Sequence, residues 1–445
     1  MNRRNFLRSS AGLTSAIILA ACAPKATAPQ DAEQPPAADP TQPPAPAPVG
    51  ERAFLRVGAW EFADRPWMAN VPLEYAEQHP EVDVEVEIII YGEAFTKAMT
   101  GAATGTLPDV FYVPVRWGPY AAFKGAFLWL DDLVEVQDPG MDDWFDAVLP
   151  NTKWEDKMYA LPNELHPGRP TTVYYNRDLL AERGVDEPTD DWTWDEYAEM
   201  ASKITDEERR IYGSAWFPTN VHDYIAMTRS WGGDLLSEDG RTCTFNTDPN
   251  SIATARFQVD MKTVYNAVPG RDEREGLQFF AGLYGFNPLA PNNIRGITEG
   301  VGDNFEWDVV MAPVGTPGLR GGYMFINSFC LSATTQHPDE AYDLAVYMTS
   351  YDVMKRALLE EGHNPHRESL WRLPEAHPIW PRAADWLTTT KAEMRWPAPW
   401  NLLFEEMQDT FVNNVLPLWY AEVPFEQGMQ EIHDAVQAVL DQPRP

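Results

Sequence analysis

The order of secondary-structure signals early in the chain is the feature that most constrains its fold. Between residues 82 and 90, apolar side chains at the even positions alternate with acidic ones, which predicts a strand with one buried and one solvated face. Apolar runs at 54–57 and 109–113 predict two further strands, and apolar residues at helical spacing over 67–78 and 95–102 predict the helices between them. Strands alternating with helices favour a mainly parallel, covered sheet, so an α/β fold is expected.

A second α/β unit is predicted to begin near Thr171. Residues 173–175 are strand-like, and a short helix is expected over 177–183. The segment 193–196, Thr-Trp-Asp-Glu, matches a capping box, in which the hydroxyl and the carboxylate satisfy amides at a helix start. Another helix is predicted to begin at Pro338, and the C-terminal third is expected to be largely helical. A chain of 445 residues has room for two or three such units.

The N-terminus has the pattern of an export signal. Residues 1–22 contain Arg3 and Arg4 ahead of an apolar run at 11–21, which is shorter than the ~20 residues of a membrane span. The arginine pair resembles a twin-arginine (Tat) signal peptide, and the Leu-Ala-Ala-Cys sequence ending at Cys22 resembles a lipobox, in which the cysteine is lipidated. An ordinary secretory signal with a chance cysteine is the alternative.

The segment after the signal is expected to be a tether. Residues 23–50 consist mostly of Pro, Ala, Gln and acidic residues, a composition that favours extended polyproline II. Such a segment would hold a folded body away from a lipid surface, although a proline-rich docking motif is the alternative. The protein is therefore expected outside the cytoplasm, anchored by lipid to a bacterial membrane and facing a periplasm or the medium.

Composition excludes several classes of protein. Hydrophobic residues make up 44% of the chain, which is enough for a buried core and too many for a fully disordered protein. The 67 acidic and 34 basic residues give a formal charge of −33, which repels phosphate backbones, so no nucleic-acid partner is expected. Three cysteines cannot form a dense disulfide framework.

Seven short motifs follow one another along the body. They lie at 105–110 (Gly-Thr-Leu-Pro-Asp-Val), 120–133, 159–162 (Tyr-Ala-Leu-Pro), 174–179 (Tyr-Tyr-Asn-Arg-Asp-Leu), 192–196, 231–234 and 307–313. Each motif is weak alone, but in this order they resemble extracellular solute-binding protein family 1, the sugar-binding lipoproteins of ABC transporters. The resemblance covers nearly all of residues 53–440. The chain departs from the family pattern after 279–282, so no ligand residue is assigned between 283 and 304.

The resemblance implies a two-lobed periplasmic-binding-protein-like fold of type II, with a hinge between discontinuous lobes. Lobe one would comprise 53–165 plus 308–350, and lobe two 170–305 plus 353–440. A sugar or oligosaccharide would bind in the interlobe cleft, which closes by hinge motion, and would be delivered to ABC transporter permease subunits. The resemblance implies no catalysis, hence no enzyme and no cofactor, and a monomer is expected.

A sugar site needs flat aromatic platforms for C–H faces and polar side chains for hydroxyl groups. Loops at the predicted strand ends carry both, and Glu164 and His166 lie in the segment expected to cross between lobes. By the family pattern, Trp60, Glu61, Arg116, Gly322, Tyr323 and Trp400 lie at or beside ligand-lining positions. The full set of expected ligand-binding residues is Trp60, Glu61, Tyr112, Arg116, Trp117, Glu164, Trp216, Trp231, Gly322, Tyr323 and Trp400.

Ordinary structural roles are the alternative to ligand binding for several of these residues. Most of the 17 tryptophans are expected to be core residues, and Glu164 could form an ordinary hinge salt bridge. His363 and His366 flank a proline, so no metal site is expected there. Cys243 and Cys330 could pair, but the family pattern puts them in different lobes, which favours free, buried thiols.

The sequence is compatible with two other functions. The same fold could bind a peptide, a polyamine or another cationic solute, which the acidic composition would suit. A secreted glycoside-active enzyme is the other alternative, since such enzymes use two carboxylates ~5 to 9.5 Å apart. No motif selects one carboxylate pair among the 67 acidic residues.

Overall fold

The computed structural model describes residues 52–60, 66–215, 221–315, 318–377, 379–389 and 402–443. All of these residues belong to one compact unit, 47–445. The predicted signal with Cys22 and the predicted tether at 23–50 lie outside the described residues. None of the described helices has the length and apolarity needed to cross a bilayer.

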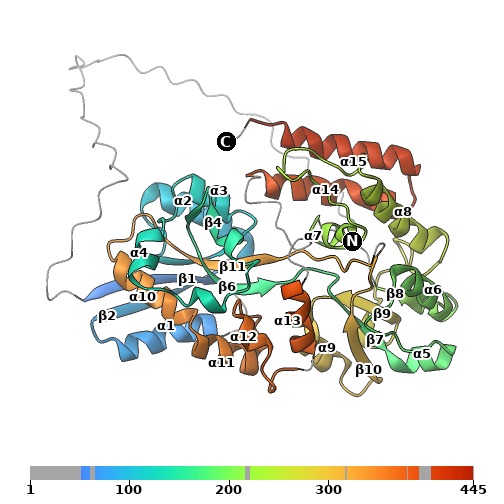
Figure 1. Ribbon diagram of the computed structural model, residues 1–445, viewed down its shortest axis with the longest axis horizontal. Coiled ribbons are helices and arrows are strands. Elements are labelled where there is room, and N and C mark those ends of the chain that lie inside the picture. Colours follow the sequence, from blue (N-terminus) through green and yellow to red (C-terminus); the bar gives the residue numbers. More distant parts are fainter. Residues whose placement is uncertain are drawn as a thin grey trace, which may run out of the picture. The chain divides into compact units, whose positions relative to one another are not determined.

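The first lobe is built around a five-stranded mixed sheet (Figure 1) with the order β2-β1-β3-β11-β6. Its strands are β1 (Ala53–Trp60), β2 (Val82–Ile89), β3 (Val110–Pro114), β6 (Leu161–His166) and β11 (Phe325–Leu331). Strand β1 pairs in parallel with β2 and β3, whereas β11 runs antiparallel to β3 and β6. The predicted strand–helix alternation therefore forms as expected, and a strand from much later in the chain extends the sheet.

Strand β2 confirms the predicted strand but not the whole of its predicted buried face. Val82 is buried, whereas Ile88 and Ile90 are 51% and 54% exposed. Ile89 is buried instead, because Gly58 on the neighbouring strand has no side chain and Ile89 and Phe111 occupy the space above it. The buried face of this edge strand thus changes near its C-terminal end.

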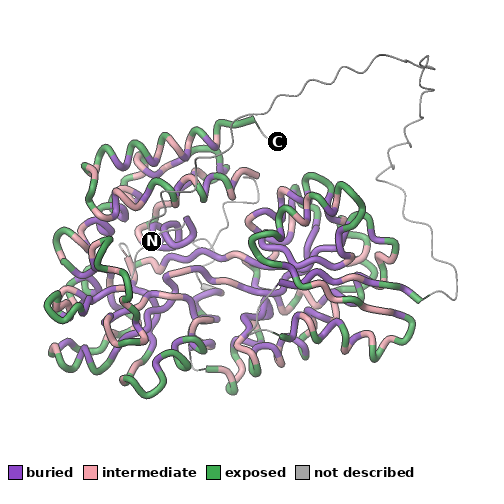
Figure 2. The backbone as a smooth tube through the Cα atoms, turned by 180° about the vertical axis from the view of Figure 1, so that it is seen from behind, coloured by how far each residue is buried: buried purple, intermediate pink, exposed green. Residues whose placement is uncertain are grey.

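Helices cover the first sheet on the outside. They are α1 (Trp67–Gln78), α2 (Ala94–Thr104), α3 (Gly118–Phe123), α4 (Asp131–Val136), α10 (Pro338–Met348), α11 (Tyr351–Glu361) and α12 (Glu368–Trp371), with a small hairpin of β4 (Lys153–Trp154) and β5 (Lys157–Met158). Helices α1 and α10 contact each other and β1. Figure 2 shows the buried strands inside and the exposed turns of the helices outside.

The second lobe contains a four-stranded sheet with the order β10-β7-β9-β8. Its strands are β7 (Thr172–Asn176), β8 (Tyr212–Ser214), β9 (Tyr284–Leu289) and β10 (Trp307–Met311). Its helices are α5 (Arg177–Arg183), α6 (Trp194–Ile204), α7 (Val221–Ser230), α8 (Pro249–Thr263), α9 (Ile294–Val301), α14 (Phe404–Trp419) and α15 (Phe425–Leu440). Helix α13 (Ile379–Thr389) contacts both β10 and α12, and its buried residues belong to the core around the first sheet. The predicted capping box is present at the start of α6, where Thr193 and Glu196 bond reciprocally to the backbone.

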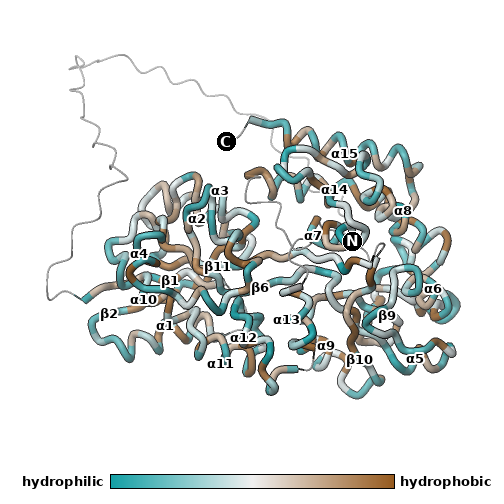
Figure 3. Tube along the Cα trace, in the orientation of Figure 1, coloured by the Kyte–Doolittle hydropathy of each residue, from teal (hydrophilic) through white to brown (hydrophobic). Residues whose placement is uncertain are grey.

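Two hydrophobic cores stabilise the unit. The first lies around the five-stranded sheet and continues onto one face of β7 through Tyr174. The second takes the opposite face of β7, at Val173 and Tyr175, together with α6, α7, α8, α14 and α15. In Figure 3 hydrophobic segments gather along β10 and β11, the strands that precede and follow a crossing between the sheets.

The chain crosses between the sheets at 167–171, from β6 to β7. The described segments 312–315 and 318–324 belong to a second crossing, from β10 to β11. Strand β10 pairs with β7 in the second sheet. After β11, α10 and α11 contact each other, and α14 contacts α7 and α8. The lobe boundaries expected at 308 and 353 remain a prediction.

The second crossing segment packs directly on α7, which generates a test. A Cβ at Gly321 would lie 2.0 Å from the carbonyl oxygen of Ala226 and 2.4 Å from the amide nitrogen of Ser230. We expect Gly321→Ala to lower the free energy of unfolding by about 2–4 kcal/mol, because backbone atoms cannot move aside cheaply. Urea unfolding of residues 47–445 measures the change.

The matched control is Gly296→Ala in α9, where an added Cβ meets nothing within 4 Å. Because alanine is the better helix former, this variant should be about 0.5–1 kcal/mol more stable than the parent. Equal stability of the two variants would contradict the close approach at Gly321.

Candidate functional site

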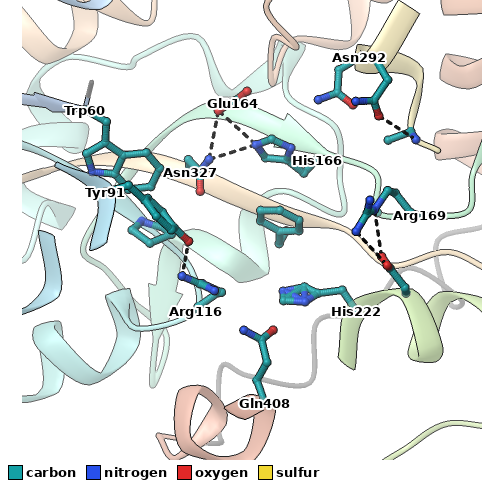
Figure 4. Close-up of a pocket in the computed structure, with 16 residues that line it drawn as sticks. Trp60, Tyr91, Arg116, Glu164, His166, Arg169, His222, Asn292, Asn327 and Gln408 are labelled. Carbon is teal, nitrogen blue, oxygen red and sulfur yellow. Dashed lines mark hydrogen bonds and ion pairs between the residues drawn. The ribbon is translucent and has the colours of Figure 1, made fainter. Parts of the chain in front are cut away.

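A cleft of about 610 Å³ is lined by residues of both lobes (Figure 4). The strands and loops of the first sheet contribute Trp60, Tyr91, Pro114, Arg116, Glu164, His166, Phe325 and Asn327. The first crossing segment and the second lobe contribute Gly168, Arg169, His222, Asp223, Ala290, Asn292, Asn293 and Gln408. The volume falls within the roughly 300–1,000 Å³ range of small-molecule sites.

Aromatic side chains form the wall of the cleft on the first lobe. Trp60, the last residue of β1, packs edge-on against Tyr91, with ring centroids 4.8 Å apart. It makes a similar contact with Tyr112 of β3, at 4.4 Å. These edge-to-face contacts hold the indole in one orientation at the edge of the sheet where β1 ends.

The cleft floor is organised around a buried carboxyl group. Glu164 of β6 is 1% exposed, and its Oε2 accepts hydrogen bonds from the Tyr112 hydroxyl at 2.8 Å and the Asn327 amide at 3.0 Å. His166 Nε2 lies 3.1 Å from the same oxygen (Figure 4). The His166 ring stacks on Phe325 of β11, with centroids 4.4 Å apart and planes 8° apart. Groups from three strands therefore position this floor.

The charged side chains of the cleft are paired. Arg116, which follows β3, donates to the Tyr91 hydroxyl and lies 3.4 Å from Glu405 of α14. Burial raises the pKa of the Glu405 carboxyl, and Arg116 partly offsets this rise. Across the cleft, Arg169 binds both carboxylate oxygens of Asp223, at 3.3 and 2.9 Å.

His222 of α7 lies within an aromatic and cationic environment. Its ring makes edge contacts with Tyr323, Phe325 and Phe404, with centroids 4.8, 5.2 and 5.7 Å away. Burial lowers the pKa of His222 well below its ordinary value, and the positive charges of Arg116 and Arg169 lower it further. The imidazole is therefore neutral at pH 7.

Two amide side chains facing the cleft retain hydrogen-bonding capacity. Asn327 and Gln408 are 5% and 7% exposed, and among the described residues Asn327 Oδ1 and Gln408 Oε1 have no hydrogen-bond partner. A buried polar atom without a partner costs about 1–3 kcal/mol, so such atoms are normally satisfied by water or a ligand. Together with the aromatic wall, they suit a ligand with both apolar faces and hydroxyl groups.

The structure brings some of the expected ligand residues together and separates others. Trp60, Arg116 and Glu164 line the cleft, and Tyr112 lies behind the wall and contacts two of them. The other four described residues do not line the cleft. Trp117 packs on Phe95, and Trp231 stacks on Trp194. The Gly322 carbonyl accepts a hydrogen bond from Arg229, and Tyr323 is buried against His222. Glu61, Trp216 and Trp400 lie outside the described residues.

Sequence patterns did not single out several residues of the cleft. No motif and no family position indicates the cleft-lining residues Tyr91, Arg169, His222, Asn292, Asn293, Asn327 and Gln408. Asn327 pairs with Glu164 in the β11–β6 register, a contact between residues far apart in the chain. Asn292 and Asn293 come from the segment 283–304, where the family pattern assigned nothing.

The candidate metal ligands and the two buried cysteines show no sign of a further site among the described residues. Within the described ranges, no cluster of His, Cys, Asp and Glu has the arrangement of a metal site. Cys243 and Cys330 are free and buried, in separate hydrophobic cores, which confirms the favoured interpretation.

Comparison with known proteins agrees with this architecture. A family model described as bacterial extracellular solute-binding protein matches residues 59–355. A binding protein of Brucella abortus is 25% identical over 319 residues, which cover 70% of this chain and 75% of that protein.

Two solved structures share the two-lobed fold. One is an ABC substrate-binding protein of Listeria monocytogenes in complex with cycloalternan, with a TM-score of 0.71 at 19% identity, covering 88% of this chain and 99% of that one. The other is the GacH receptor of Streptomyces glaucescens, determined unliganded and in complex with acarbose, with a TM-score of 0.72 at 20% identity, covering 88% and 100%.

The buried His222 predicts a pH dependence of stability. The unfolded chain takes up a proton at this residue near pH 6.5, while the folded protein resists protonation, so stability should fall as the pH drops below about 6.5. His222→Gln should remove up to about 1.4 kcal/mol per pH unit from that slope.

Urea unfolding of both proteins between pH 7.5 and 5.5 measures the difference. His366, whose pKa burial also lowers well below its ordinary value, is present in both proteins and contributes equally to both slopes. Parallel slopes would show that His222 is not held neutral by the fold.

Proposed function

We propose a function for this chain from the premise that it belongs to the family of bacterial extracellular solute-binding proteins. The chain captures a sugar or an oligosaccharide in the cleft between its lobes and delivers it to the permease of an ABC importer. The observation that carries this proposal is the cleft itself, where an aromatic wall faces buried amides with unused hydrogen-bonding capacity.

The chemistry of the cleft supports a neutral, hydroxyl-rich ligand. A sugar ring offers an apolar face to an indole or phenol ring and hydroxyl groups to amides and carboxyl groups. Arg116 and Arg169 already have acidic partners, and Glu164 is bonded to its neighbours. The Listeria protein was solved in complex with cycloalternan and the Streptomyces protein in complex with acarbose.

The N-terminal sequence supports a location outside the cytoplasm. The twin-arginine pair and the lipobox ending at Cys22 would export and anchor the protein, and the 23–50 segment would tether the body beside its permease. Binding without chemical change of the ligand is the expected behaviour of such a component.

A ligand panel tests this function. Residues 47–445 would be titrated with maltose, maltotetraose and acarbose, with spermidine and a tripeptide as the cationic and peptide alternatives, while Trp emission and thermal unfolding are followed. A ligand at 100 times its dissociation constant should stabilise the protein by ~2.7 kcal/mol, which raises the unfolding midpoint by a few degrees. A response to spermidine or peptide alone would overturn the sugar assignment, and shortened sugars after incubation would reveal an enzyme.

Gln408→Met separates ligand binding from stability. The substitution removes a buried amide whose Oε1 has no described partner, so stability should stay equal or rise. The affinity for the bound sugar should fall about 5- to 50-fold, as for loss of one or two hydrogen bonds.

The matched control for this variant is Gln437→Met in α15. Gln437 Oε1 accepts from the Cys243 amide at 2.8 Å, and its Nε2 donates to the Arg241 carbonyl, away from the cleft. This control should lose stability and keep its affinity for the sugar. An unchanged affinity in Gln408→Met would remove Gln408 from the site.

Lipid anchoring is tested at the lipobox. Cys22→Ala should move the protein from the membrane fraction to the soluble extracytoplasmic fraction, because the thiol that carries the lipid is gone. Cys243→Ala, at a buried thiol, should stay with the membrane. Membrane attachment that survives Cys22→Ala would refute the lipobox assignment.

A further inference from the structure

An ion pair joins the two lobes across the cleft. Arg116 follows β3 in the first sheet, while Glu405 lies in the first turn of α14, whose residues Phe404, Met407 and Phe411 are buried in the second core. The Arg116 Nη2 atom is 3.4 Å from Glu405 Oε1. Because each partner is fixed to a different lobe, opening of the cleft must separate them.

The first lobe holds Arg116 ready for this contact. Its Nη2 donates to the Tyr91 hydroxyl, and its guanidinium carbon lies 5.3 Å from the centroid of the Tyr91 ring. Tyr91 in turn packs against Trp60 on the same wall (Figure 4). The arginine therefore has a defined direction toward the second lobe.

The pair is only partly formed in this arrangement of the lobes. Arg116 Nε and Glu405 Oε2 are both buried, and neither has a hydrogen-bond partner among the described residues. An arginine and a carboxylate bind best through two parallel hydrogen bonds, which these two free atoms would complete. A small closing movement would join them, whereas an opening movement would break the single existing contact.

We propose that Tyr91, Arg116 and Glu405 form an interlobe latch that favours closed lobes in the ligand-free protein. Because the apparent dissociation constant equals the intrinsic constant divided by the fraction of binding-competent protein, the latch also strengthens ligand binding. The stronger ligand binding rests on the proposed function, whereas the preference for closed lobes in the ligand-free protein does not.

Small-angle X-ray scattering of residues 47–445 without ligand tests the latch. Glu405→Gln should increase the radius of gyration, and the double variant Arg116→Gln/Glu405→Gln should expand no further, because either change breaks the same pair. Salt should expand the parent protein toward the value of Glu405→Gln and leave that variant unchanged, since screening weakens the ion pair.

The matched control is Glu422→Gln. Glu422 pairs with Arg271 at 2.9 Å within the second lobe, and its side chain is 43% exposed, close to the 41% of Glu405. This variant should keep the radius of gyration of the parent. Equal radii for Glu405→Gln and Glu422→Gln, or a more compact Glu405→Gln, would overturn the latch.

Binding of maltose supplies the second readout. Glu405→Gln should bind about two- to fivefold more weakly than the parent and than Glu422→Gln. Tighter binding by Glu405→Gln would overturn the latch, since the pair would then compete with the ligand. Expansion of Glu405→Gln in a protein that binds none of the sugars would uphold the latch and refute the proposed sugar function.

Discussion

The carboxyl group of Glu164 is the constraint on which the rest of the cleft depends. A buried carboxyl group is costly unless hydrogen bonds satisfy it, and here the donors come from Tyr112 on β3 and Asn327 on β11. Satisfying Glu164 therefore requires β3, β11 and β6 to lie side by side in this order, with Asn327 opposite Glu164. The stacking of His166 on Phe325 follows from the same register. A site floor tied to three strands is rigid enough to orient a ligand.

The two lobes contribute different chemistry to the cleft. The first supplies the aromatic wall and Arg116, while the second supplies the neutral His222, the amide of Gln408 and the Arg169–Asp223 pair. Although the chain carries a formal charge of −33, the charges of the cleft are matched by partners close at hand. The net charge of the chain therefore does not predict the charge of the cleft, because each charged side chain there is paired with a nearby partner.

Local sequence patterns predicted the early strand–helix alternation and the capping box of α6, because both depend on residues a few positions apart. They failed at Ile88 and Ile90, where packing over Gly58 changed which face of β2 is buried. They also could not distinguish an aromatic residue of the wall from one of the core. Trp60 and Trp231 both stand beside small or polar residues, yet Trp60 lines the cleft and Trp231 stacks on Trp194.

The sequence by itself determined the class of the fold and the order of its motifs, and it predicts an export signal, since these depend on residue spacing and composition. Only the tertiary structure decided which polar groups meet. Glu164 and Asn327 are 163 positions apart, and Arg116 and Glu405 come from different lobes. Their contacts arise from strand register and from the way the lobes face each other, and no short window of sequence contains that information. The physical reason is that burial and pairing are properties of neighbours in space.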